Sequence, residues 1–382
     1  MIPYGKQNVN NDDISAVVEV LLSDFLTTGP GVPAFETGIC TVTGAKHAIA
    51  VNSATSALHV ACLALGLGNG DYLWTSPITF VASANVARLC GADVDFVDVD
   101  PDTLNICPVA LERKLKRASL HGKLPKIIMP VHMCGTPCDM KKIAELAMQY
   151  EVKIIEDASH ALGAYYKGNT VGACDYSDIT VFSFHPVKII TTGEGGVATT
   201  NNELLAEKMR LLRSHGVTRD TNAMQGRPHG AWYYEQIDLG LNYRMSDLCA
   251  GLGLSQLNRL EQFVNERNRL AENYDNAFCG SGLIKLPARQ KDVKSAFHLY
   301  VVKVPVEKRL YVFNSLRDVG IGVNVHYIPV YWQPYYVNLG FERGHCPIAE
   351  DVYAQILSLP LFPTLTERDQ QYIISSIERF VS

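Results

Sequence analysis

Short apolar runs alternate with segments of helical periodicity through the first half of the chain, and this alternation is the strongest constraint on its fold. A short apolar run that is bounded by polar or turn-forming residues predicts a buried strand. Such strands are expected at 48–51, 72–75, 94–97, 126–131, 153–156, 179–184 and 197–200. Helices are expected between them, through 58–65 and near 80–90, 108–117, 139–150 and 203–213. The pattern predicts an α/β domain with a mostly parallel central sheet.

The character of the sequence changes at Ser246. Helical spacing with interleaved charges predicts one long connecting helix from 246 to about 277. Apolar runs at 298–304 and 322–326, with a helix near 306–318 between them, then predict a smaller α+β unit. We therefore expect a large domain over 1–245 and a small C-terminal domain over 246–382. The sequence shows no repeat and no low-complexity linker, so the two parts are expected to pack as one body.

Composition narrows the classes of partner and compartment. Hydrophobic residues make up 47% of the 382, enough to fill a large core. The net charge is −5 and no basic block occurs, so a nucleic-acid or anionic-membrane partner is not expected. The uncharged stretch 48–70 is too polar for a membrane span, and the polar N-terminus lacks the apolar core of a secretory signal. Reduced cysteines in the cytoplasm are the expectation for the ten scattered thiols.

Two reactive side chains stand just beyond expected strand ends. The strand at 153–156 leads into Asp157, and the strand at 179–184 leads into a segment that carries Lys188 and then a glycine-rich stretch at 193–196. Because parallel sheets gather functional residues at the carboxyl ends of their strands, both side chains can face one crevice. Lys188 lies between apolar segments, and partial desolvation would lower its pKa and suit its amine to imine formation.

This pair matches the needs of pyridoxal phosphate (PLP). PLP requires a lysine for its aldehyde and a carboxylate for its pyridine nitrogen. The polar segment 52–56 at the start of a helix offers amides and hydroxyls for a phosphate, with Ser183 as a further donor. Other readings remain open: Lys188 as a surface charge, Asp157 as a helix cap or ion-pair member, Ser53 or Thr55 as a simple N-cap, and Phe80 as core rather than a ring stacked on the cofactor.

Several motifs together resemble the DegT/DnrJ family of nucleotide-sugar aminotransferases, PLP enzymes of aspartate-aminotransferase fold type I. The resemblance covers essentially the whole chain, and its most specific block surrounds Lys188. The motifs are NSATSAL at 52–58, SPITFVASAN at 76–85, EDASHALGA at 156–164, SFHPVKIITTGEGG at 183–196, RSHG at 213–216 and LGLNYRMSDLCAGLGLSQL at 239–257.

The resemblance assigns roles to individual residues. It implies that Lys188 forms the Schiff base with PLP and then moves protons between cofactor and substrate carbons, while Asp157 pairs with the pyridine nitrogen. His160 would lie against the cofactor, and its phosphate would be bound by Ser183 together with Ser53, Ala54 and Thr55. Asn242 would reach the phosphate of a neighbouring subunit, which implies a homodimer with shared active sites.

Further segments resemble the family members that aminate a UDP-linked 2-acetamido-2,6-dideoxy-L-arabino-hexos-4-ulose with L-glutamate. These segments are IPYG at 2–5, LTTGPGVPAFE at 26–36, SFHPVK at 183–188 and VHYIPVYWQPYY at 325–336. They imply that Tyr4, Thr27 and His185 lie near the sugar and that a partner subunit offers His326 and Tyr327. Tyr331 and Trp332 receive no role. Relatives that dehydrate sugars carry histidine at the position of Lys188, so the lysine here favours transamination.

Three alternatives remain at this level. A different 4-keto sugar nucleotide, on another UDP sugar or on GDP or dTDP, is a possible substrate. A PLP-binding fold retained for a regulatory role would be expected to have lost the lysine or the carboxylate, and both are present. A metal enzyme could use His132, Cys134 and Cys138, but zinc sites usually add a second ligand pair nearby, so we interpret these as ordinary side chains with no bound metal.

Overall fold

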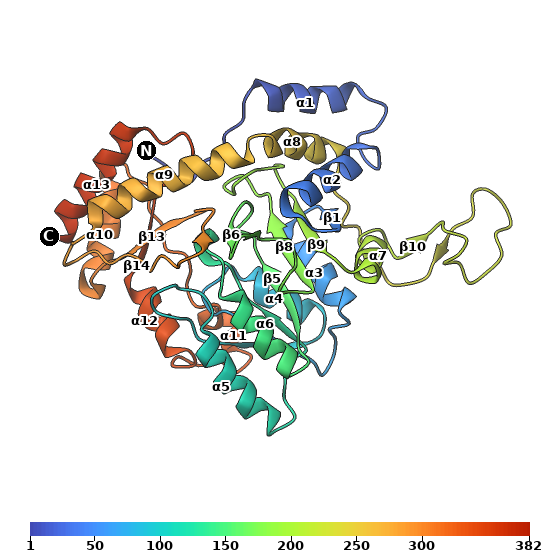
Figure 1. The fold of residues 1–382 in the computed structure, drawn as a ribbon, viewed down its shortest axis with the longest axis horizontal. Coiled ribbons are helices and arrows are strands. Elements are labelled where there is room, and N and C mark those ends of the chain that lie inside the picture. The colour runs from blue at the N-terminus through green and yellow to red at the C-terminus, as the bar shows by residue number, and fades with distance from the viewer.

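The computed structural model describes all 382 residues and centres on a seven-stranded sheet (Figure 1). Its strand order is β1-β9-β8-β5-β4-β2-β3. Only β9 runs antiparallel to its neighbours β1 and β8, and the pairings from β8 to β3 are all parallel. The expected mostly parallel sheet is confirmed. The strands are β1 (His47–Val51), β2 (Tyr72–Thr75), β3 (Asp93–Phe96), β4 (Ile127–Met129), β5 (Lys153–Asp157), β8 (Ile179–Ser183) and β9 (Gly196–Thr200).

Successive residues of the central strands feed two different cores, as the two-residue period of a strand requires. Leu73, Ile127 and Ile155 join the core under α3, α4 and α7. Their neighbours Trp74 and Ile128 join the core under α5 and α6 on the opposite face. The helices are α3 (Ala54–Ala64), α4 (Ala82–Leu89), α7 (Glu203–Leu212), α5 (Pro108–Ser119) and α6 (Met140–Gln149). Because both faces are covered, these strands read as continuous apolar runs.

The N-terminal segment forms two helices that pack on α8 (Asp247–Leu257). These are α1 (Asn11–Leu22), which opens with a reciprocal capping box between Asn10 and Asp13, and α2 (Gly31–Thr43). The buried Asp247 carboxylate accepts hydrogen bonds from the backbone N–H groups of Gly29 and Gly31 at 2.9 and 2.7 Å. This side chain therefore fixes the turn that leads into α2.

The expected single helix over 246–277 is wrong in one respect, because it is broken into α8 and α9 (Leu260–Phe278). Arg259 leaves helical geometry, with φ −110°, and its guanidinium donates to Asn8 and to the Asp13 carboxylate. Docking of the N-terminal segment at this point fixes the break. In Figure 1, α9 crosses the molecule from α8 to the C-terminal elements.

The C-terminal elements surround a two-stranded sheet of β13 (Tyr300–Lys303) and β14 (Ile356–Leu359). An apolar core formed almost wholly by residues beyond 269 lies among them. The strand expected at 322–326 is absent: of these residues only Asn324 makes a bridge, to Ser358. The helices here are α10 (Val306–Asp318), α11 (Pro334–Val337), α12 (Pro347–Gln355) and α13 (Glu367–Val381). The domain boundary near 245 remains a prediction.

Small elements complete the fold. A three-stranded sheet joins β12 (Val293–Lys294), β6 (Tyr165–Tyr166) and β7 (Asn169–Thr170), and single helical turns lie at Met133–Gly135 and Val330–Trp332. The hairpin of β10 (Val217–Thr218) and β11 (Glu235–Gln236) projects from the body, at the right of Figure 1. None of the helices combines the length and apolar character that crossing a bilayer requires.

Candidate active site

Asp157, the last residue of β5, is a buried carboxylate whose hydrogen-bond donors are all neutral. It is 4% exposed. Oδ2 accepts from Ser83 Oγ at 2.6 Å, and Oδ1 accepts from the backbone N–H and the hydroxyl of Ser159 at 3.2 and 2.5 Å. Ser83 Oγ in turn lies 2.8 Å from Thr79 Oγ1. Because no cationic side chain pairs with this carboxylate, it can still pair with a cationic group of a ligand.

Lys188 lies in the loop between β8 and β9 that begins at the same edge of the sheet. Burial lowers the pKa of its amine to about 8, against the opposing effect of the nearby Asp157 charge. With this pKa, roughly a tenth of the amine is neutral, and nucleophilic, at pH 7. The structure thus brings Lys188 and Asp157 into one electrostatic environment, as the strand ends predict.

Two histidines and a tyrosine pack beside the lysine. His298 Nε2 lies 3.5 Å from Lys188 Nζ, and the rings of His298 and His160 have centroids 4.3 Å apart. His160 Nε2 lies 3.3 Å from the Tyr327 hydroxyl. Burial, followed by the charge of Lys188, holds the pKa of both imidazoles well below the ordinary value, so both rings are neutral. The Nδ1 atoms of both rings are buried and have no hydrogen-bond partner.

His298 is a site residue that the sequence analysis missed. It falls in the run 298–304, which the pattern identifies only as a strand. The available signal was a polar residue at the start of an otherwise apolar run, and a histidine at such a position is usually a hydrogen-bonded core residue. Its contact with Lys188 joins positions 110 apart in the chain, which no local pattern can indicate.

The start of α3 and the start of β9 form a tight backbone cradle. Ser53 is the N-cap of α3, and its Oγ accepts from the Ser56 N–H at 3.1 Å. A Cβ atom on Gly196 would lie 2.5 Å from the backbone nitrogen of Ala54, so only glycine fits there. Ser183 pairs with Gly196 in the sheet, which places it beside the same helix end. A helix N-terminus with unpaired amides favours an anionic group.

These groups fit the expected cofactor. The Asp157 carboxylate can accept a hydrogen bond from a protonated pyridine nitrogen, and the Lys188 amine can form an imine with an aldehyde. The cradle at the start of α3 can hold a phosphate. The Ala54 and Thr55 amides belong to the first helical turn, where backbone N–H groups have no partner within the helix. Ser53 is also the N-cap of α3, as one alternative predicted, and this structural role is compatible with phosphate binding.

The remaining side chains expected to contact the cofactor or the sugar divide into two groups. Tyr4 packs on His326 with ring centroids 5.2 Å apart, Phe80 lies 6.3 Å from the Tyr327 ring and is 59% exposed, and His185 is exposed in the Lys188 loop. The expectation that a partner subunit supplies His326 and Tyr327 is wrong. Tyr327 contacts His160 of its own chain, because the segment before η2 (Val330–Trp332) returns to this edge of the sheet.

Thr27 and Asn242 are not brought into this cluster. Thr27 is exposed on the loop between α1 and α2 and bridges to Ser246. Asn242 is exposed and bridges to Ser214, while the adjoining Tyr243 carbonyl accepts from the Asn52 N–H at 2.9 Å. Both residues face outward from a single chain.

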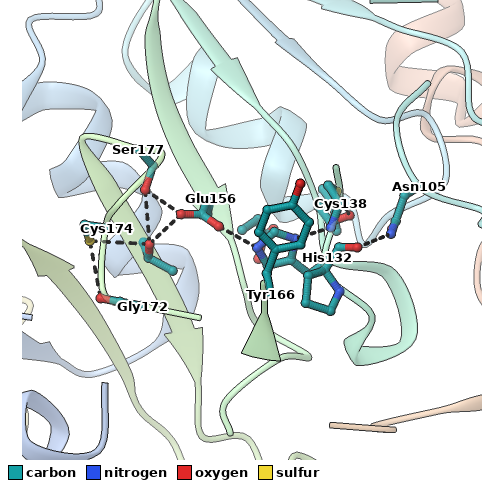
Figure 2. A network of polar contacts seen from close by, with 12 residues as sticks. Asn105, His132, Cys138, Glu156, Tyr166, Gly172, Cys174 and Ser177 are labelled. Atoms are coloured by element: carbon teal, nitrogen blue, oxygen red, sulfur yellow. Dashed lines mark hydrogen bonds and ion pairs between the residues drawn. The ribbon is translucent and has the colours of Figure 1, made fainter. Parts of the chain in front are cut away.

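A second polar network joins Glu156 of β5 to His132 (Figure 2). His132 Nδ1 accepts from the Cys138 backbone N–H at 3.1 Å, so Nε2 carries the ring proton and donates to Glu156 Oε2 at 2.7 Å. Glu156 Oε1 accepts from the hydroxyls of Ser177 and Thr180 at 2.5 and 3.0 Å. No group of three ligand side chains in the structure is placed to hold a metal ion. The network anchors Glu156, the residue of β5 that precedes Asp157.

Comparison of the sequence with known proteins finds aminotransferases and a protein of polysaccharide biosynthesis. The sequence model of the DegT/DnrJ/EryC1/StrS aminotransferase family matches residues 7–378. The spore coat polysaccharide biosynthesis protein SpsC of Bacillus subtilis is 38% identical over 388 residues, which cover 100% of this chain and 97% of that protein. The UDP-4-amino-4,6-dideoxy-N-acetyl-β-L-altrosamine transaminase of Campylobacter jejuni is 38% identical over 376 residues, with 98% and 96% coverage.

Solved structures agree with the fold. A putative sugar aminotransferase, Spr1654 of Streptococcus pneumoniae, superposes with a TM-score of 0.92 at 30% identity over 100% of this chain and 99% of its own, in a form that holds pyridoxamine phosphate. The same protein is known with PLP. Helicobacter pylori PseC, an aminotransferase of pseudaminic acid biosynthesis, superposes with a TM-score of 0.91 at 32% identity, covering 100% and 99%.

Proposed function

This chain belongs to the DegT/DnrJ/EryC1/StrS aminotransferase family, and on that premise we propose that it aminates C4 of a UDP-linked 4-keto sugar. It is an aminotransferase that depends on PLP. The proposed acceptor is UDP-2-acetamido-2,6-dideoxy-β-L-arabino-hexos-4-ulose and the proposed donor is L-glutamate. The products would then be 2-oxoglutarate and UDP-4-amino-4,6-dideoxy-N-acetyl-β-L-altrosamine, and the amino sugar would serve pseudaminic acid biosynthesis. The similarity to the altrosamine transaminase, over nearly the whole of both chains, is the observation that carries this proposal.

Each residue of the site has a task in such a reaction. PLP, when bound, supplies an electron sink that stabilises negative charge on the carbon next to the transferred nitrogen. Asp157 would keep the pyridine nitrogen protonated, and the cradle of Ser53, Ala54, Thr55 and Ser183 would hold the phosphate. His160 and Phe80 would confine the ring.

Lys188 would act on protons as well as anchor the cofactor. A pKa of about 8 in the cofactor-free protein would leave this amine able both to remove a proton and to return one close to neutral pH. It would take the proton from Cα of glutamate and deliver a proton to C4 of the sugar. The face from which Lys188 approaches C4 then fixes the configuration of the new amine.

The substrate side of the site would be formed by aromatic and imidazole groups. These groups would be Tyr4, His185, His326 and Tyr327. Burial lowers the pKa of His326 to about 4. A neutral His326 presents no positive charge to the sugar ring. These side chains would therefore orient hydroxyl and acetamido groups by hydrogen bonds.

We also propose that two copies form a homodimer with shared active sites. Thr27 and Asn242 face outward, so in a dimer each could approach the site of the other copy. Exposed apolar side chains precede each of them in the chain, on α1 and the following loop and around the β10–β11 hairpin. They include Leu21, Leu22, Phe25, Leu26, Trp232, Tyr234 and Leu239. All ten cysteines are free, which accords with a reducing compartment, and the cytoplasm is the proposed location.

The substrate assignment is tested by a pair of epimers. Purified protein with PLP and L-glutamate is given the UDP-linked L-arabino 4-keto sugar or its D-xylo epimer, and release of 2-oxoglutarate is followed. We expect turnover with the L-arabino compound alone. Turnover with only the epimer, or with only a GDP- or dTDP-linked sugar, would replace the named substrate with the alternative of another 4-keto nucleotide sugar. The similarity to SpsC keeps that alternative open.

A further inference from the structure

His298 is held rigidly just before β13. The buried Arg267 guanidinium donates to the carbonyl oxygens of Phe297 and His298 at 3.1 and 3.3 Å, and to that of Leu361 at 3.0 Å. The next backbone N–H, of Leu299, donates to the Cys134 carbonyl. His298 itself is 4% exposed. Its ring has little freedom to leave the place in which it meets Lys188.

The contact with the lysine has a defined polarity. A protonated amine has only donors, so at 3.5 Å from Lys188 Nζ the imidazole Nε2 is the acceptor and the ring proton is on Nδ1. This requires a neutral ring. The charged and titratable groups that face it are Lys188, His160, Arg267 and His326, all basic, and together with burial they oppose its protonation. The distance is long for a hydrogen bond, as is common before a site binds its ligands.

The same geometry leaves the lysine with few other partners. The Asp157 charge acts on Lys188 at longer range, while His298 Nε2 is the protein atom within hydrogen-bond distance of Nζ. The partnerless Nδ1 of His298 is a further sign that this ring is not placed to satisfy the core.

We propose that His298 is a positioning residue for Lys188: its neutral Nε2 accepts a hydrogen bond from the lysine amine and aims that amine at the reacting carbon. The proposal rests on the proposed function only in taking Lys188 as the reacting lysine, and it is independent of which nucleotide sugar is bound. Accepting this bond stabilises the charged amine, so loss of the acceptor makes Lys188 more acidic.

The test compares two variants of similar bulk. His298→Leu keeps a similar side-chain volume and removes the acceptor, whereas His298→Gln keeps an acceptor near the position of Nε2. His121→Asn, an exposed histidine at the end of α5, is the control. In the cofactor-free full chain, Lys188 is acetylated with trace acetic anhydride across pH 6 to 11, and peptide mass spectrometry gives the midpoint of its reactivity. Melting temperature reports the folding of each variant.

We expect the midpoint of Lys188 reactivity to fall by about one pH unit in His298→Leu. In His298→Gln and His121→Asn it should stay near that of the wild-type protein. With PLP bound, we expect kcat to fall at least tenfold in His298→Leu while KM for the sugar stays within about twofold. An unchanged midpoint in folded His298→Leu, or equal shifts in the Leu and Gln variants, would overturn the proposal. If His298→Leu does not fold, His298→Phe takes its place with the same criteria.

One arm separates this proposal from the assignment beneath it. PLP added before the label should protect Lys188 from acetylation. Protection together with an unshifted midpoint in His298→Leu removes only the role of His298. Absence of protection in the unmodified protein removes Lys188 as the reacting lysine, and the positioning role falls with it.

Discussion

At the residue scale, the buried amine of Lys188 makes the folded protein less stable than an apolar side chain would. Its pKa is about 8 in the folded protein, against about 10.4 in an unfolded chain. The unfolded state therefore binds this proton more tightly between those values, and the stability of the protein should rise with pH across that window. Reactivity at this position is gained at the expense of folding free energy, as at many functional sites.

We predict that Lys188→Met stabilises the cofactor-free protein at pH 7, by up to about 3 kcal/mol, since about 2.4 pK units correspond to that free energy. The gain should shrink as pH rises from 8 to 10.4, where the lysine becomes neutral in both states. Urea unfolding at pH 7 and pH 10 measures it. Lys46→Met, at an exposed position, is the control and should change little. Equal stability of Lys188→Met and the unmodified protein at pH 7 would contradict the prediction.

Residues at strand ends were the part of the site that the sequence could predict. Asp157 and Lys188 each follow a buried run, and the rule that such ends meet at one edge of a parallel sheet brings them together. His298 could not be predicted, because its place depends on Arg267 and on packing against His160. The direction from which Tyr327 arrives was also mispredicted, since it depends on how the C-terminal chain folds back.

At the scale of elements, α3 and β9 meet at the proposed phosphate cradle, and Gly196 permits their close approach. We predict that Gly196→Ala weakens PLP binding at least tenfold, because the new Cβ would push the Ala54 amide out of the cradle. An absorbance titration with PLP measures the dissociation constant. Gly282→Ala, where a Cβ meets nothing within 4 Å, serves as the matched control and should bind normally. Normal PLP affinity in Gly196→Ala would show that the cradle does not hold the phosphate.

The elements that the sequence predicted are those with a strong local period. The strands of the central sheet and the helices that cover them are present, with ends shifted by a few residues. Where tertiary contacts decide the conformation, prediction was wrong. The helical pattern is continuous in the sequence, but the helix breaks at Arg259, whose guanidinium contacts Asn8 and Asp13. The run 322–326 has the composition of a strand, but it makes only one bridge, from Asn324 to Ser358.

At the scale of the whole molecule, apolar side chains around the β10–β11 hairpin remain uncovered in a single chain. Leu239 is 81% exposed and lies three residues from Asn242. We predict that Leu239→Asp dissociates the proposed homodimer and lowers activity, since each copy would lose about 2 kcal/mol of burial and a two-fold interface loses it twice. That corresponds to roughly a thousandfold weaker association.

Sedimentation velocity and light scattering across a dilution series measure the change in mass. Leu120→Asp, an equally exposed leucine at the end of α5, is the control and should leave the mass unchanged. A monomeric unmodified protein that is fully active would contradict the shared-site proposal. An unchanged mass in Leu239→Asp would place the interface elsewhere on the surface.

The single antiparallel strand of the sheet has a kinetic consequence for the lysine. Because β9 runs antiparallel to β8, the chain leaves the sheet at Ser183 and re-enters it at Gly196, the residue that pairs with Ser183. The loop that carries Lys188 is further tied by bonds from Phe184 N–H to the Gly195 carbonyl and from Thr192 N–H to the Phe184 carbonyl. In the proposed reaction the amine of Lys188 would therefore stay tethered, at an effective concentration far above any that a dissolved amine could reach.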